Sequence, residues 1–544
     1  QMSSELAFQM LSKGLGGLAI FLFGMKSMSE GMKAVAGRRM RRIIASVTDN
    51  PFMALAAGVG VTFLLQSSSI TTVLVVGFVN SGLMMLTQAI GVILGANIGT
   101  TITGWILALE VGKYGLIIIA VGVFVLFIAK GERARFIAGV IMGLGMIFYG
   151  LELMKNGFKP MRQLPQFVEW FSYFSADNYF GVLKCALVGC VLTLIVQSSS
   201  ATLGITMGLA ATQVIPFETA AALVLGENLG TTITALFASI GAKPNAKRAA
   251  YSHVLLNFLG VAWITAVFPV YMGILEHIVA WASDLLGMSV NVMTKIALVH
   301  TGFNLLNTFI FLPLIPLLAW VVTRIVPDKP DTADISKPKF INDQVLNSPY
   351  MALDLLEREQ NHLIKTLQGH VEIIRKENAA PHLSKRHKAL LEVFKEVEDF
   401  SAELVDKRLS LELSERVLEA ANRQSLIVSV ENSLFKLGDY LTHLPSVDNL
   451  NRPADNFIEA LDAILGTTTD AIESSDPQDV DILLAITADK GDVIKKIHRT
   501  YLSVQSTLEL PDKSILLNIS NLFERIVWTL HKLGLLMYPS GDRK

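Results

Sequence analysis

The sequence predicts an all-α polytopic membrane protein with inverted repeats, two re-entrant helical hairpins and a cytoplasmic helical-bundle domain. Three observations support this prediction. Hydrophobic residues make up 51% of the chain, and the long apolar runs are concentrated in residues 14–325. A polar segment inside those runs occurs twice, with an offset of 131 residues. From about residue 327 the chain has the charge density of a soluble domain, which the net charge of −1 conceals.

Seven segments are long and apolar enough to cross a bilayer, which requires about 20 residues. They lie at about 14–32, 87–108, 113–130, 134–154, 218–238, 250–271 and 292–324. Two more apolar segments, 51–82 and 181–213, are interrupted at their centres by Gln-Ser-Ser-Ser. Each half of these has about 15 residues, which is too few to cross alone. We therefore predict two re-entrant helical hairpins with the serines at their tips.

The distribution of Lys and Arg predicts the orientation. Basic clusters occur at about 33–42, 130–135 and 243–248, and re-entrant hairpins put all three on one side of the membrane. Cytoplasmic loops carry an excess of Lys and Arg. We therefore expect a multi-pass protein of the cell (inner or plasma) membrane, with an external N-terminus and a cytoplasmic C-terminal domain.

The duplication extends beyond the serines, because Phe23–Met28 resembles Tyr149–Met154. Within a transmembrane domain of residues 1–326, we assign repeat one to about 14–130 and repeat two to about 134–271, with 292–324 as an extra span. Each repeat consists of a span, a hairpin and two further spans. Three crossings separate the starts of the repeats, and an odd number inverts one repeat relative to the other. Inverted repeats bring equivalent elements to the membrane midplane from opposite faces.

The repeated strings supply polar groups at positions where hydrocarbon would otherwise surround them. The first copy contributes Gln66, Ser67, Ser68, Ser69, Asn97, Thr100 and Thr101, and the second contributes Gln197, Ser198, Ser199, Ser200, Asn228, Thr231 and Thr232. A broken helix frees carbonyl groups, which suit a hard cation such as Na⁺, and N–H groups, which suit an anion. A single serine run could merely bond back to its own backbone. Duplication of the whole pattern favours a binding site.

Three further polar features each have a functional and a structural interpretation. Glu227 stands where the first copy has Ala96, and it could bind a cation, carry a proton, or reach water from the outer half of its span. His253 with Asn257, and His300 with Asn304, form two His-x-x-x-Asn pairs, each one helical turn apart. These pairs could bridge helices by hydrogen bonds or lie close to a substrate.

Together, the tandem Gln-Ser-Ser-Ser motifs, the two Gly-x-Asn-x-Gly-Thr-Thr strings and the following His-x-x-x-Asn resemble the type II sodium–phosphate cotransporter family over about residues 14–325. The resemblance implies inward transport of inorganic phosphate driven by Na⁺, with alternating access between the repeats and both ligands held between the hairpins. We assign phosphate binding to Ser67, Ser68, Ser69, Ser198, Ser199 and Ser200. We assign Na⁺ binding to Gln66, Asn97, Thr100, Thr101, Gln197, Asn228, Thr231, Thr232 and Glu227.

The expected partners are inorganic phosphate, Na⁺ as coupling ion and the lipid bilayer, with no nucleic acid, no other cofactor and no transition-metal site. No phosphate-binding Walker loop, catalytic triad or His-Glu metal motif occurs, so we do not expect an enzyme. One alternative is a membrane-anchored phosphate-signalling or regulatory protein that does not transport. Another is a cotransporter for a different oxyanion, or one coupled to H⁺ through Glu227.

Residues 327–348 read as a linker, and 349–544 as a cytoplasmic domain of amphipathic helices. We predict these helices at about 349–377, 382–411, 414–442, 454–475, 477–506 and 513–538. The strings Phe435–Asp439 and Glu524–Trp528 resemble the acidic motif of the PhoU family of phosphate-signalling domains. In that family the acids can bind metal clusters, but Phe435 and Trp528 each replace one. We therefore expect no metal site here, but a regulatory role or homodimer contacts.

Overall fold

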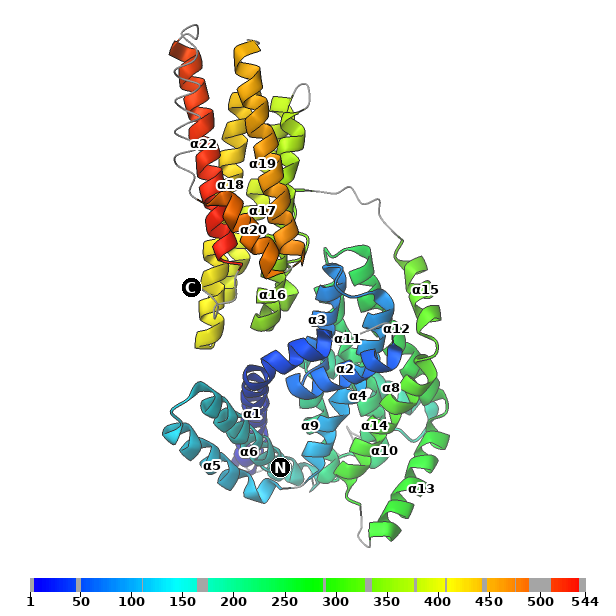
Figure 1. The fold of residues 1–544 in the computed structure, drawn as a ribbon. Helices are drawn as coiled ribbons and strands as arrows, with labels where there is room; N and C mark the ends of the chain where they lie inside the picture. Colours follow the sequence, from blue (N-terminus) through cyan, green and yellow to red (C-terminus); the bar gives the residue numbers. More distant parts are fainter. Residues whose placement is uncertain are drawn as a thin grey trace. The chain divides into compact units, whose positions relative to one another are not determined.

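The computed structural model describes residues 4–45, 50–109, 111–163, 175–286, 290–327, 335–375, 379–406, 409–442, 448–474, 476–488 and 510–537. Within these ranges the regular structure is helical and contains no strand, which confirms the prediction of an all-α protein. The chain divides into two compact units, Gln1–Lys329 and Pro330–Lys544 (Figure 1).

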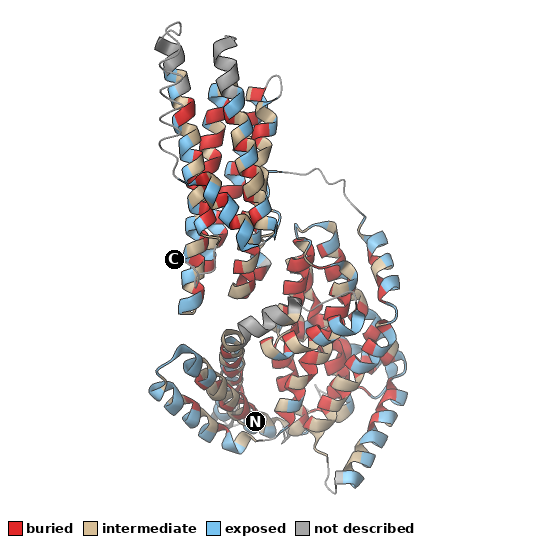
Figure 2. Ribbon diagram, viewed as in Figure 1, coloured by how far each residue is buried: buried red, intermediate tan, exposed pale blue. Residues whose placement is uncertain are grey.

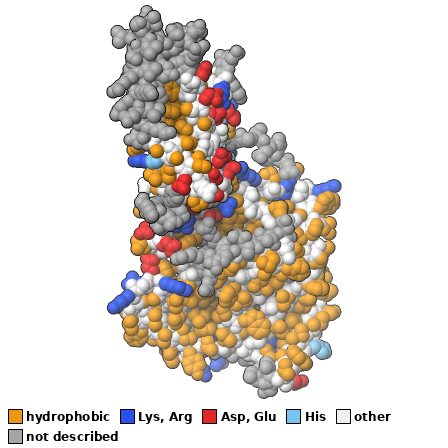
Figure 3. Space-filling view, in the orientation of Figure 1, with side chains coloured by type: hydrophobic (Ala, Val, Ile, Leu, Met, Phe, Trp, Pro, Cys, Tyr) orange, Lys and Arg blue, Asp and Glu red, His pale blue; other side chains and the backbone are white. Residues whose placement is uncertain are grey.

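The first unit contains the helices that can cross a membrane. Among its described residues, six helices are long and apolar enough to cross a membrane. They are α1 (Ser4–Ala45), α4 (Leu86–Ala108), α6 (Glu132–Phe158), α8 (Tyr179–Val196), α10 continued by α11 (Phe217–Gly230 and Thr232–Ala238), and α12 (Pro244–Ala266). Hydrophobic side chains dominate the visible surface of this unit, whereas acidic side chains gather on the second unit (Figure 3). These features agree with a polytopic membrane protein.

Three predicted elements differ from the structure. The predicted span 113–130 contains α5 (Gly115–Ile128), which has only 14 residues. The predicted extra span 292–324 is not one helix, because α14 (Val292–Phe311) and α15 (Ile315–Ile325) meet at 83°. Pro313 lies in this break, and proline cannot continue a helical hydrogen-bond ladder. Finally, α8 has 18 residues and is long enough to be a span, contrary to our expectation for each half of a hairpin.

Each Gln-Ser-Ser-Ser run separates two helices. In the first copy, α2 (Pro51–Leu65) is followed by α3 (Ser68–Asn80), and in the second, α8 is followed by α9 (Ser199–Ala211). A hydrogen bond of 2.9 Å from Thr62 Oγ1 to Thr71 Oγ1 connects α2 to α3. The serines therefore lie at helix breaks, as predicted.

Glycines bring the first arm of each hairpin against the helix that follows the hairpin. A methyl group built on Gly95 of α4 would lie 2.0 Å from the carbonyl oxygen of Leu55 in α2. The equivalent methyl group on Gly226 of α10 would lie 1.7 Å from the carbonyl oxygen of Ala186 in α8. Only glycine allows backbones to approach this closely. The two copies therefore share one helix packing at equivalent residues.

The two helices that begin the copies, α1 and α6, pack along each other through glycines seven residues apart. A methyl group on Gly24 would lie 2.7 Å from the carbonyl oxygen of Gly143, and one on Gly150 would lie 2.7 Å from that of Gly17. Residues later in α1 therefore contact residues earlier in α6, so the two helices are antiparallel. Because Gly17 corresponds to Gly143 and Gly24 to Gly150, each contact is repeated with the copies exchanged.

The elements that carry the repeated strings form the buried centre of the first unit. Helix α14 packs on α4, α9 and α10, whereas α12 packs on α3, α4 and α10. Buried residues concentrate in this group, but α5 buries only Gly115 and Gly122 (Figure 2). Across the copies, Leu203 and Met207 of α9 lie against Gly104 of α4. Most residues of the two Gly-x-Asn-x-Gly-Thr-Thr strings are thus enclosed by protein.

The second unit is a bundle of long helices. They are α16 (Pro349–Ile374), α17 (Ala379–Val405), α18 (Leu411–Thr442), α19 (Asp448–Ser474), α20 (Pro477–Thr487) and α22 (Leu510–Leu535). The predicted linker includes a short 3-10 helix, η3 (Asp343–Asn347), which contacts α16. The predicted helix 477–506 is described only as far as Thr487, because residues 489–509 lie outside the described ranges. The bundle is continuous, since α22 lies along α18 and α19 along α16.

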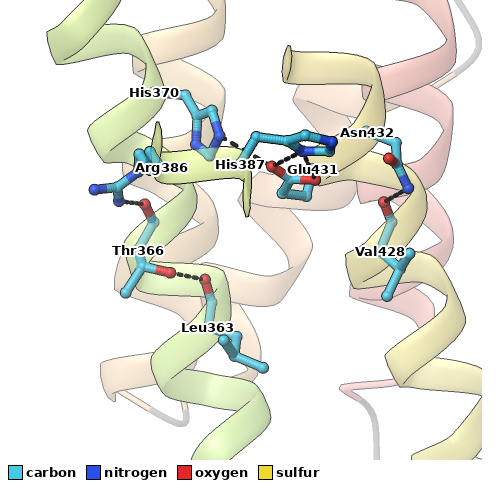
Figure 4. Close-up of polar contacts among 8 residues, drawn as sticks. All are labelled: Leu363, Thr366, His370, Arg386, His387, Val428, Glu431 and Asn432. Atoms are coloured by element: carbon cyan, nitrogen blue, oxygen red, sulfur yellow. Dashed lines mark hydrogen bonds and ion pairs between the residues drawn. The ribbon is translucent and has the colours of Figure 1, made fainter. Parts of the chain in front are cut away.

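A buried carboxylate lies within this bundle (Figure 4). Glu431 is fully buried, and its carboxylate lies 3.2 Å from His370 Nε2 and 2.9 Å from His387 Nδ1. The His387 ring stacks on Phe435 with 4.0 Å between centroids. Phe435 therefore supports the packing of a histidine at this position. Nearby, burial lowers the pKa of the Arg386 guanidinium, which donates to the carbonyl of Thr366.

Candidate functional site

The two hairpin tips have the same backbone conformation. Gln66 ends α2 with φ 53° and ψ 30°, and Gln197 ends α8 with φ 53° and ψ 27°. This left-handed conformation is uncommon for residues other than glycine. In both copies the glutamine N–H donates to a threonine carbonyl four residues earlier, at 2.7 Å. The repeated motif therefore encodes a specific reversal of the chain.

The second helix of each hairpin begins with a serine cap. Ser67 Oγ accepts from the N–H of Ile70 at 3.3 Å, and Ser198 Oγ accepts from that of Ala201 at 3.3 Å. The first N–H groups of a helix have no acceptor within the helix and carry its positive dipole end. The N–H groups that begin α3 and α9 can therefore bind an anion together with the serine hydroxyls.

The tip glutamines differ in their surroundings. Gln66 is buried, its Nε2 donates to the Phe63 carbonyl at 2.6 Å, and its Oε1 accepts from Thr103 Oγ1 at 3.3 Å. Gln197 is exposed. The hydroxyl of Thr193, which corresponds to Thr62, is buried and has no hydrogen-bond partner among the described residues. The first tip is therefore closed by hydrogen bonds that the second tip does not form at the equivalent positions.

The threonines of both Gly-x-Asn-x-Gly-Thr-Thr strings donate to carbonyl groups of their own helices. Thr100 donates to the Ala96 carbonyl at 3.0 Å and Thr101 to that of Ile98 at 2.8 Å. Thr231 and Thr232 donate in the same way, at 2.7 and 2.8 Å. Each hydroxyl oxygen keeps lone pairs, so a cation could still be bound. The helix itself breaks only in copy two, where Thr231 separates α10 from α11.

The asparagines of the two strings are held by different helices. Asn97 Nδ2 donates to Asn257 Oδ1 of α12 at 3.3 Å. Asn228 Oδ1 lies 3.3 Å from both His300 Nε2 and Asn304 Nδ2 of α14. The His-x-x-x-Asn pairs therefore bridge helices, one pair for each copy. The sequence showed the repeated pairs, but not that α12 serves the first copy.

Glu227 is buried, with 2% of its surface exposed, so the interpretation that it reaches water is wrong. Its Oε1 accepts a 2.9 Å hydrogen bond from Thr206 Oγ1 of α9. The equivalent residues of copy one are Ala96 and Val75, so the carboxylate and its donor are both additions to copy two. Among the described residues, no Lys or Arg forms an ion pair with Glu227. Sequence reasoning missed Thr206, although the comparison with Val75 could have identified it.

The described hydrogen bonds of each serine tip stay within its own copy. Contacts between the copies instead include α1 with α6, α3 with α11 and α12, and α4 with α9 and α12. The structure thus gathers Asn97 with Asn257 at the interface between the copies, and Asn228 with His300 and Asn304 of the extra span. The predicted meeting of the two serine tips stays a prediction.

Comparison with known proteins identifies the family. The Na⁺/Pi-cotransporter family model matches residues 20–156 and again residues 170–307, together just over half of the chain. YjbB of Salmonella typhimurium, named as a candidate inorganic phosphate export protein, is 29% identical over 63% of this chain and 61% of its own length. The uncharacterized protein YqeW of Bacillus subtilis is 29% identical over 57% of this chain and 97% of its own length.

A shorter match involves the human sodium-dependent phosphate transport protein 2B, which is 41% identical over 18% of this chain and 14% of its own length. No solved structure matches the chain. The chain spans 61% of the length of YjbB. The two family-model matches cover the two copies that carry the hairpins and the repeated strings. The chain therefore belongs to the Na⁺/Pi-cotransporter family, whose members are transporters rather than enzymes.

Proposed function

We propose that this protein is a secondary active importer that couples the inward movement of inorganic phosphate to Na⁺. The observation that carries this proposal is the duplicated tip, in which a left-handed glutamine precedes a serine-capped helix start in both copies. Each tip presents N–H groups to an anion and amide and hydroxyl oxygens to a cation. A cation and an anion bound together would balance each other's charge where fixed positive charge is scarce.

The phosphate ligands in this proposal are the tip serines and the N–H groups beside them. They are Ser67, Ser68, Ser69, Ser198, Ser199 and Ser200. Side-chain oxygens of the two copies bind Na⁺, since hard cations prefer oxygen ligands. These come from Gln66, Asn97, Thr100, Thr101, Gln197, Asn228, Thr231, Thr232 and Glu227.

Transport would proceed by alternating access between inverted copies. The antiparallel packing of α1 on α6 supports inversion, because these helices begin the two copies and carry equivalent glycines. The difference between the tips supports alternation, because Gln66 is buried while Gln197 is exposed. Inverted repeats commonly move against each other about a site near the midplane.

The direction of phosphate transport is part of the proposal. YjbB is named for phosphate export, whereas the human relative is named for sodium-dependent phosphate transport. We favour import, because an inward Na⁺ gradient drives a co-bound anion in the same direction. The N-terminus would be external and the second unit cytoplasmic, where a PhoU-like bundle would regulate transport or mediate homodimer contacts.

Reconstitution tests the proposal. Full-length protein in proteoliposomes should accumulate radiolabelled phosphate under an inward Na⁺ gradient. It should not accumulate phosphate under an inward K⁺ gradient at the same pH or under an outward Na⁺ gradient. Accumulation under both cations would overturn Na⁺ coupling. No phosphate accumulation under any gradient would overturn the substrate assignment, and sulfate and arsenate would then test the wider oxyanion class.

A second candidate function is coupling to H⁺, and the burial of Glu227 favours it. A carboxylate enclosed with one hydroxyl donor and no paired cation is a natural site for a proton or a bound cation. Glu227→Gln should therefore change the dependence of uptake on Na⁺ or on pH. An unchanged dependence on both would exclude Glu227 from coupling.

A further inference from the structure

The two His-x-x-x-Asn pairs make corresponding contacts. Helix α12 packs on α3, α4 and α10, and α14 packs on α4, α9 and α10. In each pair the asparagine Nδ2 donates to the histidine carbonyl, at 3.0 Å in α12 and 2.9 Å in α14. Each pair also bonds the asparagine of its own string. The pairs therefore make corresponding contacts with the two strings, although α12 lies in repeat two and α14 in the extra span.

The histidines of these pairs nevertheless have different contacts. His300 Nε2 lies 3.3 Å from Asn228 Oδ1, within hydrogen-bond distance. His253 is fully buried, and neither of its ring nitrogens has a hydrogen-bond partner among the described residues. This difference does not depend on the orientation of the asparagine amides, because it concerns the imidazoles alone.

A buried imidazole without a partner is unfavourable. The corresponding histidine, His300, shows what the partner would be, because it contacts Asn228, the asparagine that corresponds to Asn97. Inverted copies can exchange conformations when a transporter opens to the opposite side. In the exchanged state His253 would bond to Asn97, and His300 would lose its partner.

We propose that His253 and His300 are positioning residues that hold the string asparagines in alternation. His300 holds Asn228 in the state seen here, and His253 holds Asn97 in the opposite state. The two histidines thereby balance the equilibrium between the states. This inference rests on the proposed alternating access, but it can be tested without measuring transport.

The test measures the accessibility of the tips. In a background with Cys185 and Cys190 replaced by alanine, Gln197→Cys and Gln66→Cys serve as separate reporters. Gln197 is exposed here and Gln66 is 7% exposed, so a maleimide should label the first reporter faster. The ratio of the two rates in detergent-solubilised full-length protein reports the balance between the states.

His300→Phe removes the bond to Asn228 and keeps a ring of similar size. The ratio of labelling rates, Gln197→Cys divided by Gln66→Cys, should fall by roughly three- to tenfold, the effect of one hydrogen bond. His253→Phe should raise the ratio by a similar factor, because it weakens the opposite state. A merely structural role would move the ratio in the same direction for both variants.

His300→Leu and His253→Leu provide a second matched pair where a phenylalanine variant fails to fold, judged by size-exclusion chromatography. They should shift the ratio in opposite directions, as the phenylalanine variants do. Shifts in one direction, or no shift, overturn the alternating role. Opposite shifts in a protein that transports no phosphate would retain the alternating role and reject the proposed substrate.

Discussion

The two copies of the repeated segment have the same backbone and different polar contacts. Their tips share φ angles of 53° at the glutamines, and their glycines bring equivalent carbonyls against α4 and α10. Yet hairpin one is connected by the Thr62–Thr71 bond, whereas Thr193 of hairpin two has no such bond. Backbone packing thus preserves the shared architecture, while side-chain hydrogen bonds distinguish one copy from the other. Substitutions in matched pairs can separate these two contributions.

The largest expected effect concerns the tips. Gln66→Ala and Gln197→Ala should each abolish Na⁺-driven phosphate uptake into proteoliposomes, because each removes an oxygen ligand and an amide donor from one copy. Gln213→Ala is the matched control, since Gln213 is also left-handed, with φ 58°, but lies outside the motif. Wild-type uptake by either tip variant would remove that copy from the site.

A smaller but symmetric effect should come from the packing glycines. Gly95→Ala and Gly226→Ala place a methyl group 2.0 and 1.7 Å from carbonyl oxygens, so the helices must separate. Each should lower the free energy of unfolding by about 1–3 kcal/mol or more. Thermal unfolding in detergent measures this loss, with Gly273→Ala as a control because no atom lies within 4 Å of the added methyl group. A loss in only one copy would contradict equivalent packing.

The Glu227–Thr206 pair should behave as a unit. Thr206→Val removes the donor to a buried carboxylate and should destabilise the protein by about 1–3 kcal/mol. Adding Glu227→Ala recreates the Ala96–Val75 combination of copy one and should recover much of that loss. The four thermal unfolding curves of this double-mutant cycle measure the coupling. Additive losses would show that the two side chains do not depend on each other.

The smallest expected effect compares two equivalent threonines. Thr62→Val removes the hydrogen bond to Thr71 and should cost about 1 kcal/mol of stability. Thr193→Val removes a buried hydroxyl without a described partner and should be neutral or slightly stabilising. Thermal unfolding of both variants, measured side by side, gives the difference. Equal destabilisation would mean that the two hairpins are held alike.

The sequence was informative where one local signal determines the structure. The Gln-Ser-Ser-Ser runs predicted both helix breaks, because serines cap helices and interrupt apolar runs. The bend in the extra span was not predicted, because total hydropathy concealed the effect of Pro313, which lies between α14 and α15. The burial of Glu227 and the attachment of Asn97 to α12 depend on packing between distant segments. No periodicity within a single segment encodes such contacts.

The contact between α1 and α6 has a consequence for the separate halves. Gly17 and Gly24 meet Gly150 and Gly143, which are their own counterparts in the other copy. The contact surface is thus self-complementary, as in a dimer with twofold symmetry. A polypeptide that contained only one copy would carry both sides of this contact. Two such polypeptides, inserted in opposite orientations, could pair through the same row of glycines.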